Sequence, residues 1–227
     1  MITSPFLNLM TTVQSADFSK LVSGKGYVVI GGQIIFEKDG KYYLTTIEED
    51  RDDFTIADYQ TLPEGAPFEL LNGKLHYIPS PFRKHQLVAM NLSAAIHYFV
   101  KRHKLGQVLP APMDVHFDKR NIVQPDLIFV SNERKEILEQ YIKGAPDFLV
   151  EILSFGTKTK DLGEKRELYG REGVLEYWVI DPNAETITVF LNNQNELIRQ
   201  KIYNSEEVIT AHTIRNFSMS VKTIFEE

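Results

Sequence analysis

Residues 124–130 read QPDLIFV, and this stretch decides the fold because it places Pro125 and Asp126 at the start of an apolar run. A second apolar run, FLVEILSF at residues 148–155, carries Glu151 inside it. Short runs of this kind are typical of strands buried on both faces of a sheet. An ionised carboxylate in such a strand costs free energy unless a cation or hydrogen-bond donors compensate it. The two acids therefore need a common explanation.

Helical patterns flank these two runs. Residues 86–104 have apolar side chains at the three-and-four spacing of one helical face, and we expect Gly106 to provide the left-handed cap. Residues 133–142 are expected to be helical and to connect the two buried strands as a crossover unit. Residues 160–173 predict a further helix. The expected fold class is α/β, with a mixed sheet and flanking helices.

Turn signals predict several hairpins around this core. Asn72-Gly73 suits a type I′ turn within residues 68–78, which places Glu69 on a strand. A strand over 175–181 and a hairpin over 185–203 follow the last predicted helix. Residues 27–47 predict a β-meander of three short strands.

A charged cluster, IEEDRDD at residues 47–53, is typical of a solvated linker. We therefore expect a β-rich amino-terminal extension over residues 1–50 and a main domain over residues 54–227.

The composition and the motifs exclude several classes of functional site. The 227 residues contain no cysteine, which excludes disulfides, thiolate zinc sites and cysteine nucleophiles. The six histidines show no two-ligand spacing, and neither a phosphate loop nor a serine-hydrolase elbow is present, so we expect no nucleotide cofactor. The net charge of -6 argues against a general nucleic-acid coat but allows a local basic patch. Without a secretory signal or a membrane-span pattern, we expect a cytoplasmic protein with no membrane partner.

Carboxylates at the ends of neighbouring buried strands would suit a divalent cation. Magnesium takes one or two carboxylates and fills its other positions with water and substrate phosphate. Asp126 and Glu151 lie on different strands that can pair, whereas Asp147 and Glu151 stand about 13 Å apart along one strand. We interpret Asp147 as a turn or strand-start residue. The alternative for the other two acids is that Asp126 begins a strand and Glu151 pairs with a buried arginine or lysine.

Lys165 is the candidate cation of the site. It shares a helical stripe with Leu162 and Tyr169 that should face the sheet. An inward ammonium beside the carboxylates would steady a phosphate or polarise an attacking water. The alternative is a solvated lysine whose stem covers apolar surface. Lys158 and Lys160 stand at the start of this helix, where we expect a loop whose lysines can meet a DNA backbone; the alternative is that they are only solvated.

The sequence resembles the PD-(D/E)XK nuclease superfamily, and within it the Uma-type restriction endonucleases. The motifs FELLNG, SPFRKHQ, VQPDLIFVS, GAPDFLVEILS and KDLGEKRELYG carry the resemblance over residues 54–226. It implies a restriction-endonuclease-like core in which Asp126 and Glu151 bind Mg²⁺ or Mn²⁺, with Glu69 joining them. The implied activity is endonucleolytic hydrolysis of DNA.

The superfamily's lysine stands two residues after the second acid, and this chain has Leu153 there. Either Lys165 replaces that lysine or the fold is catalytically degenerate and binds nucleic acid or protein without cutting.

His85 matches a family position also filled by histidine, and Gln124 precedes the Pro-Asp pair, so both are candidate substrate contacts alongside Lys158 and Lys160. The alternatives are a capping or packing function for His85 and a plain surface position for Gln124. Because enzymes that cut both strands often have two-fold symmetry, we expect a homodimer.

Overall fold

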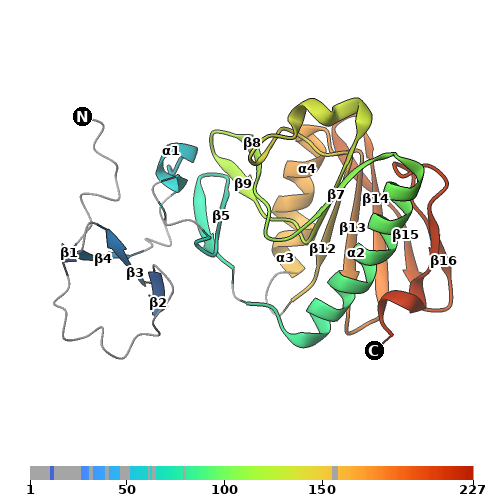
Figure 1. The fold of residues 1–227 in the computed structure, drawn as a ribbon, viewed down its shortest axis with the longest axis horizontal. Coiled ribbons are helices and arrows are strands. Elements are labelled where there is room, and N and C mark those ends of the chain that lie inside the picture. Colours follow the sequence, from blue (N-terminus) through green and yellow to red (C-terminus); the bar gives the residue numbers. More distant parts are fainter. Residues whose placement is uncertain are drawn as a thin grey trace. The chain divides into compact units, whose positions relative to one another are not determined.

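The computed structural model describes residues 52–60, 62, 65–78, 80–154 and 158–226, together with the backbone of four short strands nearer the amino terminus. The chain forms two compact units, Met1–Pro79 with Asp118–Ile122 and Ser80–Phe117 with Val123–Glu227. Figure 1 labels their elements. In the part of the chain that is described, no helix is long and apolar enough to cross a membrane.

The first unit contains two groups of strands. Antiparallel pairing in the order β1-β4-β3-β2 confirms the predicted three-stranded meander and adds one strand. Its strands are β1 (Thr11–Thr12), β2 (Tyr27–Ile30), β3 (Gln33–Lys38) and β4 (Lys41–Thr46). Whether residues 1–50 act as a separate extension stays a prediction.

The predicted hairpin around Asn72 is confirmed. It joins β5 (Phe68–Leu71) to β6 (Lys74–Tyr77), and Asn72 and Gly73 have φ angles of 52° and 80°, as a type I′ turn requires. The short helix α1 (Ile56–Tyr59) precedes it, and β9 (Asn121–Val123) pairs with β5.

A six-stranded mixed sheet forms the centre of the second unit. Its order is β15-β14-β13-β12-β10-β7, and among these neighbours only β12 and β13 run parallel. The strands are β7 (Gly106–Pro110), β10 (Leu127–Ser131), β12 (Phe148–Ile152), β13 (Glu176–Asp181), β14 (Thr186–Asn193) and β15 (Glu196–Asn204). Two smaller pairs accompany it: β8 (Val115–Asp118) with β11 (Ile142–Lys143), and β16 (Val208–Thr210) with β17 (Ser218–Ser220).

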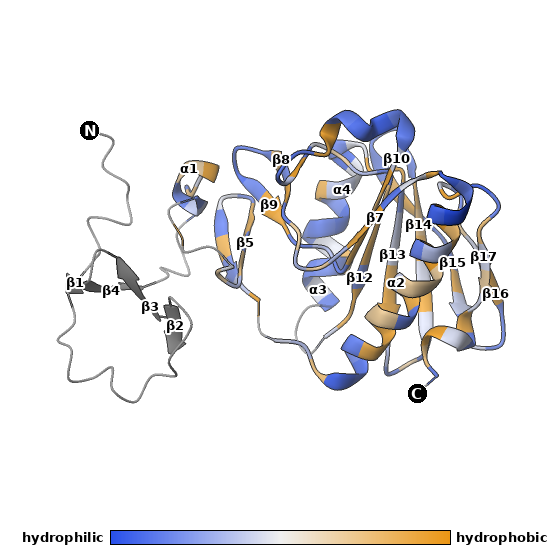
Figure 2. Cartoon of the chain, viewed as in Figure 1, coloured by the Kyte–Doolittle hydropathy of each residue, from blue (hydrophilic) through white to orange (hydrophobic). Residues whose placement is uncertain are grey.

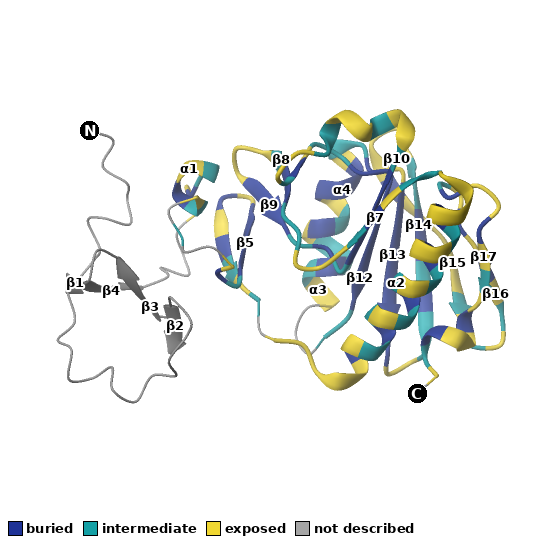
Figure 3. Cartoon of the chain, in the orientation of Figure 1, coloured by how far each residue is buried: buried dark blue, intermediate teal, exposed yellow. Residues whose placement is uncertain are grey.

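Helices lie on both faces of this sheet. The long α2 (Arg83–His103) packs Val88, Leu92 and Ile96 against alternate residues of β12 and its neighbours, including Phe148 and Val150. Figure 2 shows apolar residues and Figure 3 shows buried residues along β12 and β13. The opposite face receives α3 (Lys158–Lys160), the π-helical η4 (Asp161–Lys165) and α4 (Arg166–Glu172). The mixed sheet with flanking helices is thus confirmed.

Residues 133–142 do not form the predicted helix. Residues Asn132–Ile137 form a short 3₁₀ helix, η3, that buries none of its side chains. A helix with no apolar face to bury gains little from packing. The crossover prediction is also wrong because β10 and β12 are antiparallel, a pairing that needs no long connection.

The cap prediction for α2 is wrong as well. Lys104 holds the left-handed conformation, with φ 54° and ψ 43°, and its N–H contacts the carbonyls that end the helix. Gly106 instead lies in β7, where a Cβ atom would stand 2.1 Å from the carbonyl oxygen of Val130. Its function is therefore close strand packing.

Glu176 shows how this fold accommodates a wholly buried carboxylate. Its oxygens accept hydrogen bonds from the Trp178 indole N–H, the His212 and Thr213 backbone N–H groups and the Thr213 hydroxyl, all at 2.8 Å. Four donors compensate the loss of hydration, so this acid is structural.

Replacing Gly106 with alanine should destabilise the protein by about 2 kcal/mol, because the new methyl group overlaps a backbone atom that can move only with β10. Denaturant unfolding measures the change. Gly163→Ala is the matched control, since a Cβ atom there meets nothing within 4 Å. Equal stabilities of the two variants would contradict the packing function assigned to Gly106.

Candidate active site

The register of β10 against β12 places the two predicted acids side by side. Leu127 pairs with Val150, so the preceding Asp126 lies opposite Glu151 on the same face of the sheet. Directly opposed residues in antiparallel strands have Cβ atoms about 5 Å apart. Two carboxylates that are distant in sequence are thereby brought together next to α4.

Asp126 is held by one of its carboxylate oxygens. Its Oδ2 accepts a 2.7 Å hydrogen bond from the backbone N–H of Ile152 and lies 3.3 Å from Nε2 of His85. Its Oδ1 takes no hydrogen bond from any residue that the structure describes, and the side chain is 17% exposed. The fold therefore fixes one oxygen of Asp126 and leaves Oδ1 without a donor in the described part of the chain.

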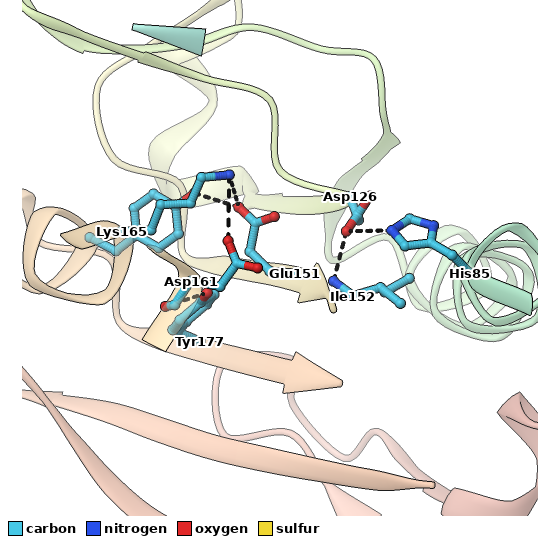
Figure 4. A network of polar contacts seen from close by, with 8 residues as sticks. His85, Asp126, Glu151, Ile152, Asp161, Lys165 and Tyr177 are labelled. Carbon is cyan, nitrogen blue, oxygen red and sulfur yellow. Dashed lines mark hydrogen bonds and ion pairs between the residues drawn. The ribbon is translucent and has the colours of Figure 1, made fainter. Parts of the chain in front are cut away.

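Glu151 is buried and compensated by two donors on one helical segment. The Lys165 ammonium lies 2.9 Å from Oε1, and the Tyr169 hydroxyl donates to the same oxygen at 2.6 Å. Only 5% of Glu151 and 4% of Lys165 are exposed, so the solvated alternative for Lys165 is wrong. Figure 4 shows the Glu151 carboxylate between the Lys165 ammonium and Asp126.

A π-helical turn delivers Lys165 to this position. It spans Asp161–Lys165 within what the sequence predicted as one regular helix. The Tyr177 hydroxyl donates to the Asp161 backbone carbonyl at 3.1 Å, and the Asp161 carboxylate lies 3.9 Å from the ammonium. Isolated π turns inside helices occur often at functional sites.

Two members of this network were missed at the sequence level. Tyr169 was expected only as part of the helical stripe that faces the sheet, and it is fully buried there, but its hydroxyl also donates to Glu151. Asp161 was not considered, although its four-residue spacing from Lys165 is a signal for an ion pair on a helix.

Burial lowers the pKa of His85, but its hydrogen bond with Asp126 and the negative charge of Asp126 outweigh that effect and raise the pKa above 6.5. Nδ1, its second ring nitrogen, is buried and has no partner among the described residues. His85 thus orients Asp126 rather than lying free on the surface.

The remaining predicted site residues have other contacts or lie in the other compact unit. Gln124 donates to Asp114 at 2.8 Å. Lys158 and Lys160 form α3 instead of the predicted loop, because the helix begins before residue 160, and Lys158 pairs with Asp181 at 3.5 Å. Glu69 is buried on β5 of the other compact unit, so its part in the site stays a prediction.

The donor set fits a hard divalent cation. Among the described residues, no three acidic or histidine side chains gather as a metal cluster. Magnesium needs only one or two carboxylates, however, and the open oxygen of Asp126 beside Glu151 supplies that chemistry.

Comparison with known proteins agrees with this architecture. Residues 56–222 match the sequence profile of Uma2, described as "Putative restriction endonuclease". A crystal structure of a putative nuclease belonging to DUF820 from Anabaena variabilis ATCC 29413 superposes with a TM-score of 0.65 at 22% sequence identity. The match covers 76% of this chain and 97% of that one. No match was found among curated proteins.

Breaking the buried ion pair should be costly. We expect Lys165→Met to destabilise the protein by about 3 kcal/mol or more, because it leaves the Glu151 charge buried. Adding Glu151→Gln should cost less than the sum of the two single changes, which a double-mutant cycle by denaturant unfolding measures. Lys158→Met, at an exposed pair, should change stability by less than about 1 kcal/mol. Additive effects at Lys165 and Glu151 would contradict the pairing.

The contact between His85 and Asp126 should make stability depend on pH. Because the folded pKa of His85 is raised, its charged contribution is complete below the unfolded value of about 6.5 and is lost as pH rises through the folded value. In chelator-treated protein, His85→Gln should cost about 1 to 2 kcal/mol at acidic pH and less at alkaline pH. A larger cost at alkaline pH would contradict the raised pKa.

Proposed function

Since this chain belongs to the Uma2 family of putative restriction endonucleases, we propose that it is a metal-dependent endonuclease that hydrolyses DNA phosphodiester bonds. The observation that carries the proposal is the pairing of Asp126 with Glu151 across β10 and β12, with the Lys165 ammonium against the second acid. Glu151 pairs with the buried Lys165, which is the ion pair that the alternative interpretation of the sequence expected. The proposal therefore rests on Asp126 beside it, whose Oδ1 has no donor among the described residues.

Asp126 and Glu151 would hold Mg²⁺ or Mn²⁺, with Glu69 as a third candidate ligand. When bound, such an ion neutralises charge that develops on the phosphate and lowers the pKa of a bound water. Within the protein, the Ile152 N–H and His85 fix one oxygen of Asp126 and leave Oδ1 for the ligand. Tyr169 fixes the orientation of Glu151.

Lys165 would perform the task of the superfamily's strand lysine from a helix. Its ammonium compensates Glu151 before substrate binds and would then stabilise negative charge on a phosphate oxygen. Leu153 occupies the usual lysine position. The π turn at Asp161–Lys165 would instead place the Lys165 ammonium at Glu151. The PD-(D/E)XK assignment therefore requires Lys165, which lies at a different sequence position from the superfamily's lysine but pairs with the second acid, Glu151.

Asp126→Asn and Glu151→Gln should each lower the rate of DNA cleavage by about 100-fold or more, because each neutralises a proposed metal ligand. Cleavage of plasmid, single-stranded and branched DNA with Mg²⁺ or Mn²⁺ is the measurement, and chelator should abolish it. Isothermal titration with Mn²⁺ should show weaker binding in both variants.

Asp147→Asn is the matched control, because Asp147 also follows a proline but accepts the Ser131 N–H and lies 3.5 Å from Arg134. It should lose stability and keep its cleavage rate. Absence of cleavage on all three DNA forms with both metals, by a folded protein, would overturn the proposal.

We also propose a homodimer, since cleavage of both strands is readily achieved by two symmetry-related sites. Mass measurement in solution tests this directly, and a monomer at the concentration used for cleavage would contradict it.

A further inference from the structure

A cavity of about 490 Å³ lies on the α4 face of the main sheet, beside the acids but not formed by them. Its base comes from β13, β14 and β15, and its walls come from the helical segment Lys158–Arg166 and from Leu153. The volume falls within the range of pockets that hold small molecules and cofactors. Its lining combines apolar side chains with threonine hydroxyls and cations.

The cavity carries an excess of positive charge. Lys158, Arg166 and Arg199 line it together with one acid, Asp181, which lies 3.5 Å from the Lys158 ammonium. Among the described residues, neither arginine donates a hydrogen bond or pairs with a carboxylate. Two uncompensated guanidinium groups at one cavity contrast with a chain whose net charge is -6. Guanidinium groups match phosphate oxygens in a two-point geometry, so the lining favours a phosphate group.

One of these guanidinium groups packs over an aromatic ring. Arg166 is half-buried and lies over the Phe190 ring, with 5.7 Å between its Cζ atom and the ring centroid. Arg199 lies on β15 at the position that pairs with Phe190 and is exposed. The two arginines therefore approach the cavity from a helix and from a strand next to the same ring.

Residues that line the cavity are neighbours in sequence of the proposed active-site residues. Leu153 lines it and stands two residues beyond Glu151, about 7 Å along the strand and on the same face. The backbone N–H of Leu153 still donates to the Ile180 carbonyl, so the strand direction is maintained there. Arg166 directly follows Lys165. A nucleic-acid strand bound at Glu151 thus has a neighbouring phosphate-binding cavity.

We propose that this cavity binds one unpaired nucleotide of the substrate strand. Its phosphate would contact Arg166 and Arg199, and its base would lie among Leu153, Ile202 and the hydroxyl groups of Thr186 and Thr188. A base pair in a duplex presents no unpaired base to this cavity, so the substrate needs a single-stranded segment or a frayed end. The assignment rests on the proposed nuclease function and names the substrate class of the same site.

The test measures binding of DNA by the 227-residue chain without metal, so that it does not depend on cleavage. Fluorescence anisotropy in chelator compares a short single-stranded DNA with a blunt duplex of the same sequence. Arg199→Gln and Arg166→Gln should each weaken single-strand binding about tenfold. Each should also reduce the salt dependence of that binding by a log–log slope of about 0.7. Duplex binding should change by less than about twofold.

Arg171→Gln is the matched control, because Arg171 lies on α4 but pairs with Glu172 at 3.1 Å and does not line the cavity. It should bind both DNA forms as the unmodified protein does. Thermal unfolding verifies that each variant folds. Arg199 is exposed and Arg166 is half-buried, so the change at Arg199 should affect stability less.

Competition identifies what the cavity recognises. A deoxynucleoside 5′-monophosphate should displace the labelled single strand at lower concentration than inorganic phosphate does. Equal potency of the two competitors would show that the cavity binds anions without recognising a nucleotide, and this would overturn the nucleotide assignment.

The arginine variants give a second check. Unchanged single-strand binding in both arginine variants, or an equal loss of duplex binding, would also overturn the nucleotide assignment. If the unmodified protein cleaves DNA and the arginine variants bind single strands normally, the nuclease function is supported and the nucleotide-binding cavity is not. If the arginine variants bind single strands weakly but the unmodified protein cleaves no DNA, the cavity is supported and the nuclease function is not.

Discussion

The ion pair between the Glu151 carboxylate and the Lys165 ammonium is the constraint on which the rest of this structure depends. Glu151 lies inside a strand that is covered on both faces, where an unpaired charge would cost several kcal/mol. Compensation has to come from α4 or the turn before it, because the other face of β12 packs against α2. The helix is therefore tied to this sheet by charge as well as by apolar contact.

The two faces of the sheet consequently differ in kind. On the α2 side, Phe148, Val150 and Trp178 form part of a continuous apolar core, and the buried carboxylate of Glu176 on this face is compensated by its four donors. On the α4 side, aromatic side chains such as Tyr169 and Tyr177 pack edge to face with 5.1 Å between their ring centroids while their hydroxyls bond to the polar network. Stability and chemistry are thus separated by the alternation of side chains along the strands.

The buried acids of this fold are distinguished by what surrounds them. Glu176 has four donors, and Asp147 is held by the Ser131 N–H and Arg134. Asp126 has one oxygen that is held and one that has no donor among the described residues. A carboxylate whose hydrogen-bonding capacity is used up stabilises the fold, whereas one with capacity left over remains available to a cation or substrate.

The sequence by itself predicted the strand that follows Asp126, the strand that carries Glu151, the strands over residues 175–203 and the hairpin at Asn72-Gly73. Periodicity, turn residues and residue spacing are local properties of the chain. The sequence also indicated that Lys165 faces inward. Only the tertiary structure decided the antiparallel pairing of β10 with β12, the left-handed cap at Lys104 and the π turn that brings Asp161 and Tyr169 to the site. These features depend on which strand and helix surfaces meet, and that is settled by packing between segments distant in the chain rather than by any local pattern.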